Sequence, residues 1–302
     1  MANGPVSQIV FRSALAACNN EAHLRVYSQA VLGGIRESLY EGGWSGGATP
    51  IVVAKLDSPI ACTSKGLTNI CLYYLSTDNK LCEYAYDSGK GWYQGALTNS
   101  GFPVAAYTSI SACFLPGSTL QLRVYAQVAD NSIQEFGFNS DGKGWQKMTN
   151  LGQALTGTSL ATCSYSGPAG LSIRTYLQAP NLNLIEKAYD NGKSWYTGSF
   201  SVPNAVCRAS LAVCAFNASS SGVSLRVYYS GKNDVLLEKA YDGSWYDGGF
   251  NQPCIPGSKV AVIAWGNVQI RVYFQNGTDV TAVSEWCWNG GWVAGNGALP
   301  PA

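Results

Sequence analysis

The stretch LRVYYSGKNDVLLEKAYDGSW, residues 225–245, is one of six copies of a pattern that recurs along the whole chain. The pattern runs from an apolar residue, an arginine and a tyrosine to a glutamate, then to an aromatic residue three positions later, a glycine-rich turn and a tryptophan. The glutamate follows the tyrosine by ten residues in five copies and by twelve in the last. The copies begin 45–52 residues apart, at Leu24, Ile70, Leu122, Ile173, Leu225 and Ile270.

Each copy is predicted to form four short strands. A run of small residues such as SLAVC (210–214) gives the first strand, the LRVY segment the second, the glutamate segment the third and the tryptophan segment the fourth. Turn signals such as Asp141-Gly and Asn191-Gly separate them. A four-stranded unit repeated at this spacing is the signature of a β-propeller. We therefore expect an all-β, six-bladed β-propeller with four short antiparallel strands per blade, as a single domain over residues 1–302.

The composition excludes several classes of partner. Charged residues make up 12% of the chain and the net charge is +1, without a basic block, which argues against binding to nucleic acid or to an anionic membrane. No apolar stretch approaches the roughly 18 residues needed for membrane insertion. The first residues, MANGPVSQIVFRSALAAC, lack a basic region, and Arg12 interrupts the apolar run. We expect a protein that is cytoplasmic or released without a conventional signal peptide.

Five of the ten cysteines are predicted to be packing residues. They end similar small-residue runs, one per repeat, and cysteines at one structural position do not easily pair with each other. Metal-ligand spacing is absent, and His23 is the only histidine, so we expect no metal and no cofactor. The five cysteines are Cys18, Cys62, Cys113, Cys163 and Cys214.

Strand parity predicts a pocket between neighbouring blades. Arg25 and Tyr27 project from one face of a blade and Leu24 from the other, while Glu37 and Tyr40 lie three apart and point to opposite faces. Each cleft thus receives an arginine and a glutamate from one wall and apolar and aromatic side chains from the other. The alternative is that the arginine and glutamate form a salt bridge and bind no ligand. A buried ion pair, however, rarely stabilises a protein more than apolar packing does. A charged fork beside an aromatic wall suits a sugar.

The repeated residues resemble those of the fungal fucose-binding lectins of the orange-peel-mushroom (Aleuria) type and their two-repeat bacterial relatives. The last copy, IRVYFQNGTDVTAVSEWCWNGGW (270–292), is especially similar to the bacterial repeat. The resemblance covers about residues 11–295. It implies a multivalent lectin for L-fucose and fucosylated glycans that uses neither metal nor catalysis and forms a homodimer.

The resemblance also implies which residues bind fucose. The arginine and glutamate of one blade would hydrogen-bond the sugar, and the next blade would supply an apolar residue for the methyl group, an aromatic residue and a tryptophan. The five sites so implied are Arg25, Glu37, Ile70, Tyr86 and Trp92; Arg123, Glu135, Ile173, Tyr189 and Trp195; Arg174, Glu186, Leu225, Tyr241 and Trp245; Arg226, Glu238, Ile270, Trp288 and Trp292; and Arg271, Glu285, Leu24, Tyr40 and Trp44.

The second site departs from this pattern. Cys71 stands where the arginine is expected, and it leaves Glu83 with Leu122, Phe138 and Trp145. A cysteine offers no guanidinium fork, and a phenylalanine donates no hydrogen bond. We expect this pocket to be weak or defective, so that five of the six sites bind.

Two other functions compete with the lectin. A glycoside hydrolase needs two carboxyl groups that flank one bond, and each predicted pocket has one recurring glutamate and no recurring second acid. A propeller scaffold for protein binding would not need the same arginine, glutamate and aromatic residue in every blade. We therefore expect a protein that is not an enzyme, with the scaffold as the first alternative.

Overall fold

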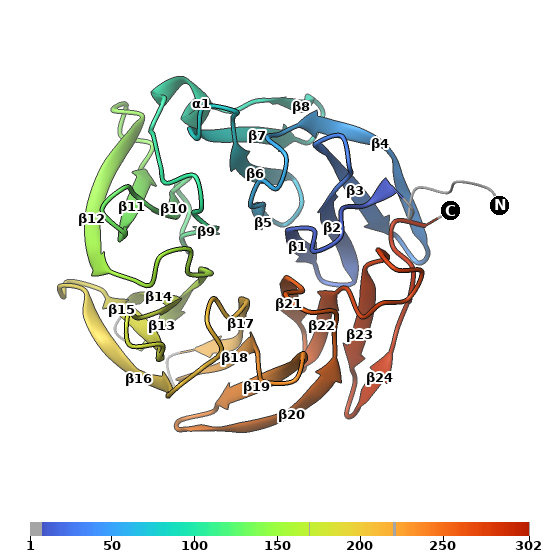
Figure 1. The fold of residues 1–302 in the computed structure, drawn as a ribbon. Helices are drawn as coiled ribbons and strands as arrows, with labels where there is room; N and C mark the ends of the chain where they lie inside the picture. The colour runs from blue at the N-terminus through green and yellow to red at the C-terminus, as the bar shows by residue number, and fades with distance from the viewer. Residues whose placement is uncertain (1–7, 169, 220–221, 302) are drawn as a thin grey trace.

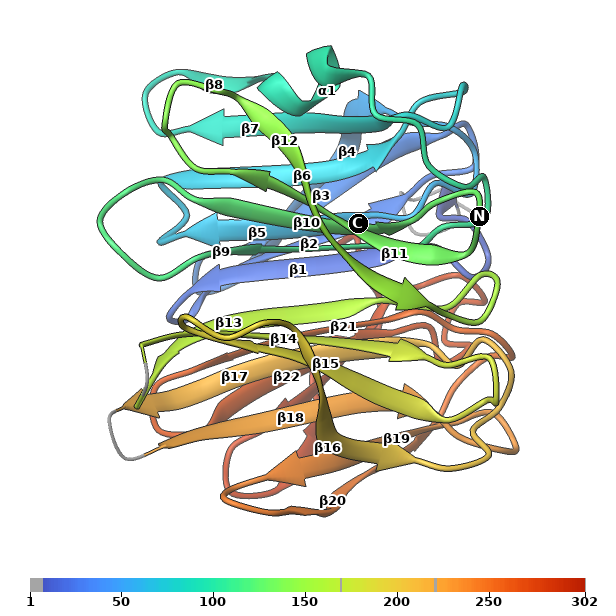
Figure 2. The ribbon, with the colours of Figure 1, turned by 90° about the vertical axis from the view of Figure 1, so that its left-hand side faces the viewer.

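The computed structural model describes residues 8–168, 170–219 and 222–301, whose six four-stranded antiparallel sheets form a closed ring (Figure 1). Within each sheet the strands follow chain order, with the first strand innermost. Figure 2 shows from the side that the inner strands run from one face of the disc to the other. The predicted six-bladed propeller with four strands per blade is confirmed.

The same four strand positions recur in every blade. The first strands are β1 (Leu15–Asn20), β5 (Ala61–Lys65), β9 (Ile110–Phe114), β13 (Ala161–Gly167), β17 (Leu211–Ser219) and β21 (Val260–Trp265). The second strands are β2 (His23–Gln29), β6 (Asn69–Leu75), β10 (Leu122–Gln127), β14 (Gly170–Gln178), β18 (Gly222–Ser230) and β22 (Gln269–Phe274). The third strands are β3 (Gly34–Tyr40), β7 (Leu81–Asp87), β11 (Ser132–Phe138), β15 (Leu184–Asp190), β19 (Val235–Tyr241) and β23 (Ser284–Trp288). The fourth strands are β4 (Trp44–Val53), β8 (Gly91–Gln94), β12 (Trp145–Gln153), β16 (Tyr196–Val202), β20 (Trp245–Pro253) and β24 (Trp292–Ala294).

The apolar core lies between the blades. Each second strand has a neighbouring strand on both edges and a neighbouring blade on both faces, so most of its residues are buried. Leu184 and Phe200 of blade 4, for example, pack in one cluster with Leu211 and Val227 of blade 5. The clefts between blades are therefore the places where side chains of two repeats meet.

Buried glutamines at the ends of second strands tie neighbouring blades together. Gln178 donates to the carbonyl oxygen of Val206 (2.9 Å) and accepts from the amide of Arg208 (2.7 Å), in the loop that leads to blade 5. Gln275 does the same across the ring closure: it donates to Val10 (3.0 Å) and accepts from the amide of Ser13 (3.0 Å). Blade 6 is thus joined to blade 1 by hydrogen bonds equivalent to those between blades 4 and 5.

One short helix, α1 (Ala96–Ser100), follows β8 of blade 2. It contacts β7 of the same blade and β12 of blade 3. It lies at the outer edge of the ring (Figure 1). No helix among the described residues is both long enough and apolar enough to cross a membrane.

The prediction that five cysteines share one position is wrong for Cys62. Cys18, Cys113, Cys163 and Cys214 each lie opposite the arginine of the second strand. In blade 2 that position belongs to Thr63, which is opposite Cys71, while Cys62 is opposite Leu72. The register of β5 differs by one residue from what sequence similarity suggested, and a one-residue shift sends a side chain to the other face. All ten cysteines are free, which agrees with the expectation for the five in the small-residue runs.

Candidate functional site

Each cleft between blades is built around a hydrogen bond from a tyrosine to a glutamate. We number blades in chain order and give each cleft the number of the blade that supplies its glutamate. Tyr228 of β18 lies directly opposite Glu238 of β19, so the two side chains share one face. The fully buried phenol donates to the carboxylate at 3.1 Å. The same bond occurs in all six blades, at 2.7–3.1 Å.

The fourth strand supplies a second contact to the glutamate. The pairing of the third and fourth strands shifts register around the glutamate in blades 1, 3, 4 and 5. The freed backbone turns an amide toward the carboxylate in blades 3 and 5: Thr149 donates to Glu135 at 3.3 Å, and Phe250 donates to Glu238 at 3.0 Å. The glutamate is therefore fixed by its own blade before any ligand arrives.

A glycine three residues after the tryptophan makes room for this carboxylate. A Cβ atom on Gly198 would lie 1.8 Å from Glu186 Oε1, and one on Gly248 would lie 2.4 Å from Glu238 Oε2. Five of the six copies carry this glycine, and Met148 replaces it in blade 3. In blade 1, however, a Cβ atom on Gly47 would meet Pro300 and not the Glu37 carboxylate. Sequence reasoning missed this position, although the spacing of tryptophan and glycine was a visible signal.

The arginine is held beside the glutamate without closing on it. In blades 3 to 6 its Nε atom lies 3.5–3.9 Å from the carboxylate, which is longer than a good hydrogen bond. Its Nη1 atom donates to the carbonyl oxygen of the preceding residue, at 2.9 Å for Arg226 and Leu225. An aromatic side chain of the first strand also lies under the guanidinium in blades 4 to 6, namely Tyr165, Phe216 and Trp265.

The next blade supplies the aromatic wall of each cleft. Its tryptophan meets the buried tyrosine edge-on, with ring centroids 6.0–6.3 Å apart in all six clefts. The aromatic residue at the end of its third strand leans on that tryptophan, as Trp288 does on Trp292 at 5.5 Å. The apolar residue that opens each repeat, such as Ile270, is buried against the same cluster. The walls are thus those that parity predicted.

Two clefts contain open cavities that gather whole predicted sets. Cleft 5 has a cavity of about 170 Å³ lined by all five residues predicted for it, including Arg226, Glu238 and Trp292. Cleft 4 has a wider cavity of about 970 Å³, again lined by all five, including Arg174 and Glu186. In cleft 5 the indole Nε1 of Trp292 is buried and has no hydrogen-bond partner among the described residues.

Sequence reasoning missed a second acid in some clefts. Asp190 and Asp242 directly follow the aromatic residue of the third strand, and each bonds Nη2 of its blade's arginine at 3.0 Å. Tyr246 donates to Asp242 at 2.5 Å, and Tyr196 donates to Asp190. Both aspartates line the cavity of cleft 4, and Asp242 also pairs with the arginine of cleft 5, so the expectation of one acid per pocket is wrong for these clefts. The signal was present in the sequence, where Asp or Glu follows this aromatic residue in four copies.

Burial sets the electrostatics of the glutamates. It raises the pKa of Glu37, Glu83, Glu135, Glu186 and Glu238 above the ordinary value of 4.5. The tyrosine bonds, and the arginine where one is present, act in the opposite direction without cancelling the effect. A carboxyl in this state gains from any ligand that donates hydrogen bonds to its ionised form.

Cleft 2 is closed by its own side chains. Cys71 lies in one apolar cluster with Leu97, Leu122 and Trp145, and Trp145 is buried whereas the other five repeat tryptophans are partly exposed. The amide of Leu97 in α1 donates to Glu83 at 3.0 Å, beside the bond from the tyrosine. The carboxylate of this cleft therefore already has its donors.

Cleft 1 keeps its arginine and glutamate but arranges them differently. Arg25 Nη1 lies 2.6 Å from Glu41, and no ion pair within 4.0 Å joins Arg25 to Glu37 among the described residues. Leu39 lies opposite Arg25, where the other blades have a smaller residue. The guanidinium is drawn away from the carboxylate, so cleft 1 differs from clefts 3 to 6.

Comparison with known proteins gives one consistent result. The sequence profile of the family described as "Fungal fucose-specific lectin" matches residues 9–302. The chain is 44% identical to a fucose-specific lectin of Aspergillus fumigatus, over all of both chains. It is 32% identical to the fucose-specific lectin of Aleuria aurantia, over 92% of this chain and 90% of that protein.

Solved structures show the same similarity. The SapL1 lectin in complex with alpha methyl fucoside superposes with a TM-score of 0.93 and 44% identity, over 99% of this chain and 100% of that one. The six-bladed Aleuria aurantia lectin superposes with a TM-score of 0.83 and 28% identity, over 96% and 97%.

The glycine beside the glutamate gives a test of the cleft geometry. Gly198→Ala places a methyl group on the Glu186 carboxylate, and we expect it to break the bond from Tyr176, which is 2.7 Å long. Loss of this buried bond is expected to lower the free energy of unfolding by about 1–3 kcal/mol. Gly43→Ala is the control, because its Cβ atom meets nothing within 4 Å. Equal urea midpoints for the two variants would contradict the geometry.

Proposed function

The chain belongs to the family of fungal fucose-specific lectins, and on that premise we propose that it binds L-fucose and fucosylated glycans in the clefts between its blades. The observation that carries the proposal is the cavity of cleft 5. There Arg226 and Glu238 of one blade face Ile270, Trp288 and Trp292 of the next around about 170 Å³. Charged hydrogen-bonding groups thus stand on one wall and apolar groups on the other.

The chemistry of this cleft suits a deoxy sugar. The Glu238 carboxylate accepts hydroxyl donors, and Arg226 donates from a guanidinium that its own backbone holds in place. The indole N–H of Trp292 is buried without a partner in the described part of the chain, so a sugar oxygen would satisfy it. Ile270 and the aromatic rings offer apolar surface to the methyl group and the C–H face.

We propose further that the protein is a binding protein and not an enzyme. Hydrolysis of a glycosidic bond uses two carboxyl groups that are free to act on it. The additional acids of clefts 4 and 5, Asp190 and Asp242, are each paired with an arginine and a tyrosine of the same blade. Repetition of one constellation around the ring also favours multivalent binding, in which linked sites raise the affinity for a fucosylated surface.

The clefts are proposed to be unequal. Clefts 3 to 6 hold the arginine within 3.5–3.9 Å of the glutamate and form the strong set. Cleft 1 is a weaker site, since Arg25 is paired with Glu41. Cleft 2 is defective because Cys71 replaces the arginine and Trp145 is buried.

One property of the whole molecule is proposed on other grounds. Resemblance to the family supports a homodimer.

Retention on immobilised L-fucose tests the function. We expect the protein to bind the resin, to elute with free L-fucose and to bind equally well in EDTA, because every proposed contact is made by a side chain. Galactose serves as the control sugar. A protein that passes through the resin would exclude the lectin, and binding that EDTA abolishes would exclude this mechanism.

Calorimetric stoichiometry tests which clefts bind. The wild-type chain is expected to take up five fucose molecules at saturation, four tightly and one weakly. Arg226→Ala removes the charged donors of cleft 5 and should lower the tight class by one, since each charge-assisted bond contributes about 1.5–3 kcal/mol. Cys71→Ala is the matched control at the same repeat position and should leave the stoichiometry unchanged. Six equivalent sites would contradict the assignment.

The raised pKa of the cleft glutamates predicts how binding depends on pH. Sugar hydroxyls bind the ionised carboxylate, so affinity should fall as pH falls and should begin to fall above pH 4.5. The folded state holds these protons more tightly than the unfolded chain does. The contribution of these carboxyls to stability therefore grows as pH falls, and binding should be lost before the fold. Fucose titrations from neutral to acid pH with parallel circular dichroism measure both, and a constant affinity down to pH 4.5 would refute the link.

A further inference from the structure

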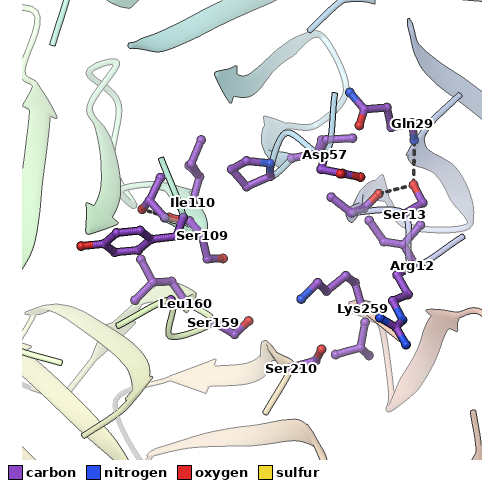
Figure 3. A pocket seen from close by; sticks show the side chains of 18 of the residues that line it. Arg12, Ser13, Gln29, Asp57, Ser109, Ile110, Ser159, Leu160, Ser210 and Lys259 are labelled. Carbon is purple, nitrogen blue, oxygen red and sulfur yellow. Dashed lines mark hydrogen bonds between the residues drawn. The ribbon is translucent and has the colours of Figure 1, made fainter. Parts of the chain in front are cut away.

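The first strands of all six blades surround a central channel, and one mouth of this channel contains a cavity of about 540 Å³ that is separate from the clefts between blades. Loops from all six blades line it, at the points where each chain segment enters an inner strand (Figure 3). The charged residues in its lining are Arg12, Asp57 and Lys259. Arg208 lies close enough to Lys259 to lower its pKa, so three successive blades, 5, 6 and 1, bring a cation to this mouth.

Lys259 lacks a partner for its charge. In Figure 3 its side chain projects from blade 6 toward the middle of the cavity. None of the described residues forms an ion pair or a hydrogen bond with its ammonium group. Lys259 is exposed to solvent, and the surrounding protein, Arg12 and Arg208 lower the pKa of its ammonium group. An anion in the cavity would stabilise the charged form of this lysine.

The two arginines occupy backbone positions that favour glycine. Arg12 has φ 66° and Arg208 has φ 58°, in the left-handed region. The equivalent positions in the loops of blades 4 and 6 are Gly157 and Gly257, with φ 75° and 74°. A side chain with a Cβ atom is strained there and glycine is not. Retained strain of this kind points to a role for the side chain itself.

Both guanidinium groups are held by a hydrogen bond from Nε, and their Nη atoms remain available as donors. Arg12 donates from Nε to the carbonyl oxygen of Pro256 at 2.7 Å, and Arg208 does so to Thr156 at 3.0 Å. Within the described residues, nothing accepts a hydrogen bond from the Nη atoms of either. Ser159 accepts the amide of Leu211 at 3.2 Å, which leaves its hydroxyl hydrogen free to donate into the cavity.

We propose that this mouth of the channel binds an oxyanion, a phosphate or sulfate either free or as an ester on a sugar, through Lys259, Arg12 and Arg208. Guanidinium and ammonium groups match the several oxygens of such an anion, and a partly enclosed cavity strengthens the attraction. Asp57 is the one carboxylate in the lining, against the two cations Arg12 and Lys259, and Arg208 adds a third positive charge near Lys259. The site lies apart from the sugar clefts and does not depend on the function proposed for them.

Calorimetry with inorganic phosphate at constant ionic strength tests the proposal on the full chain. We expect saturable binding to the wild type and at least tenfold weaker binding to Lys259→Gln. Lys232→Gln removes the same charge from an exposed turn and should bind phosphate as the wild type does. Asp57→Asn removes the opposing carboxylate and should bind it more tightly. Circular dichroism spectra and thermal unfolding midpoints that match the wild type show that each of the three variants is folded.

Glucose 6-phosphate in a parallel titration distinguishes the sources of the anion. Tighter binding than inorganic phosphate indicates a phosphorylated or sulfated sugar, and equal binding indicates the free anion. The proposal is overturned if the wild type shows no saturable binding of either compound, or if Lys259→Gln and Lys232→Gln bind phosphate equally well.

Discussion

The hydrogen bond from a fully buried tyrosine to a glutamate holds both the ring and its clefts in place. It occurs in all six blades at 2.7–3.1 Å. Either group left alone in the interior would cost about 1–3 kcal/mol, so each one makes burial of the other tolerable. The tryptophan of the next blade packs against the same tyrosine ring. One contact therefore joins two blades and orients the carboxylate that faces their cleft.

This arrangement explains how the clefts differ while the fold stays regular. Blade 2 has lost its arginine but keeps the bond from Tyr73 to Glu83, and α1 supplies a further donor to the carboxylate. The bond is thus needed by the ring whether or not its cleft binds a ligand. Residues that the ring does not need are free to vary, such as Leu39 beside Arg25 in cleft 1. The six blades can therefore share one backbone fold although their clefts differ in affinity for a ligand.

The two kinds of charged site in the molecule follow different rules. In the clefts, each arginine lies near one or two carboxylates of its own blade, so its positive charge is compensated before a ligand binds. At the channel mouth, cations of three blades converge without ion pairs, on loops whose backbone favours glycine. A balanced site suits a neutral sugar with many hydroxyls, whereas an unbalanced one suits an anion.

The sequence alone determined the fold and the composition of the cleft walls, because both depend on local periodicity. Six copies at regular spacing require six blades, and the alternation of side chains along a strand assigns each repeated residue to a wall. The tertiary structure decided what depends on register and on contacts between distant loops. The register of β5 places Cys62 one position away from the other repeat cysteines, and Asp190 and Asp242 form ion pairs with arginines. The cavity of cleft 4 is also far larger than that of cleft 5. The tertiary structure also brought Arg12 beside Lys259, which no spacing along the chain predicts, because ring closure joins the two ends of the sequence.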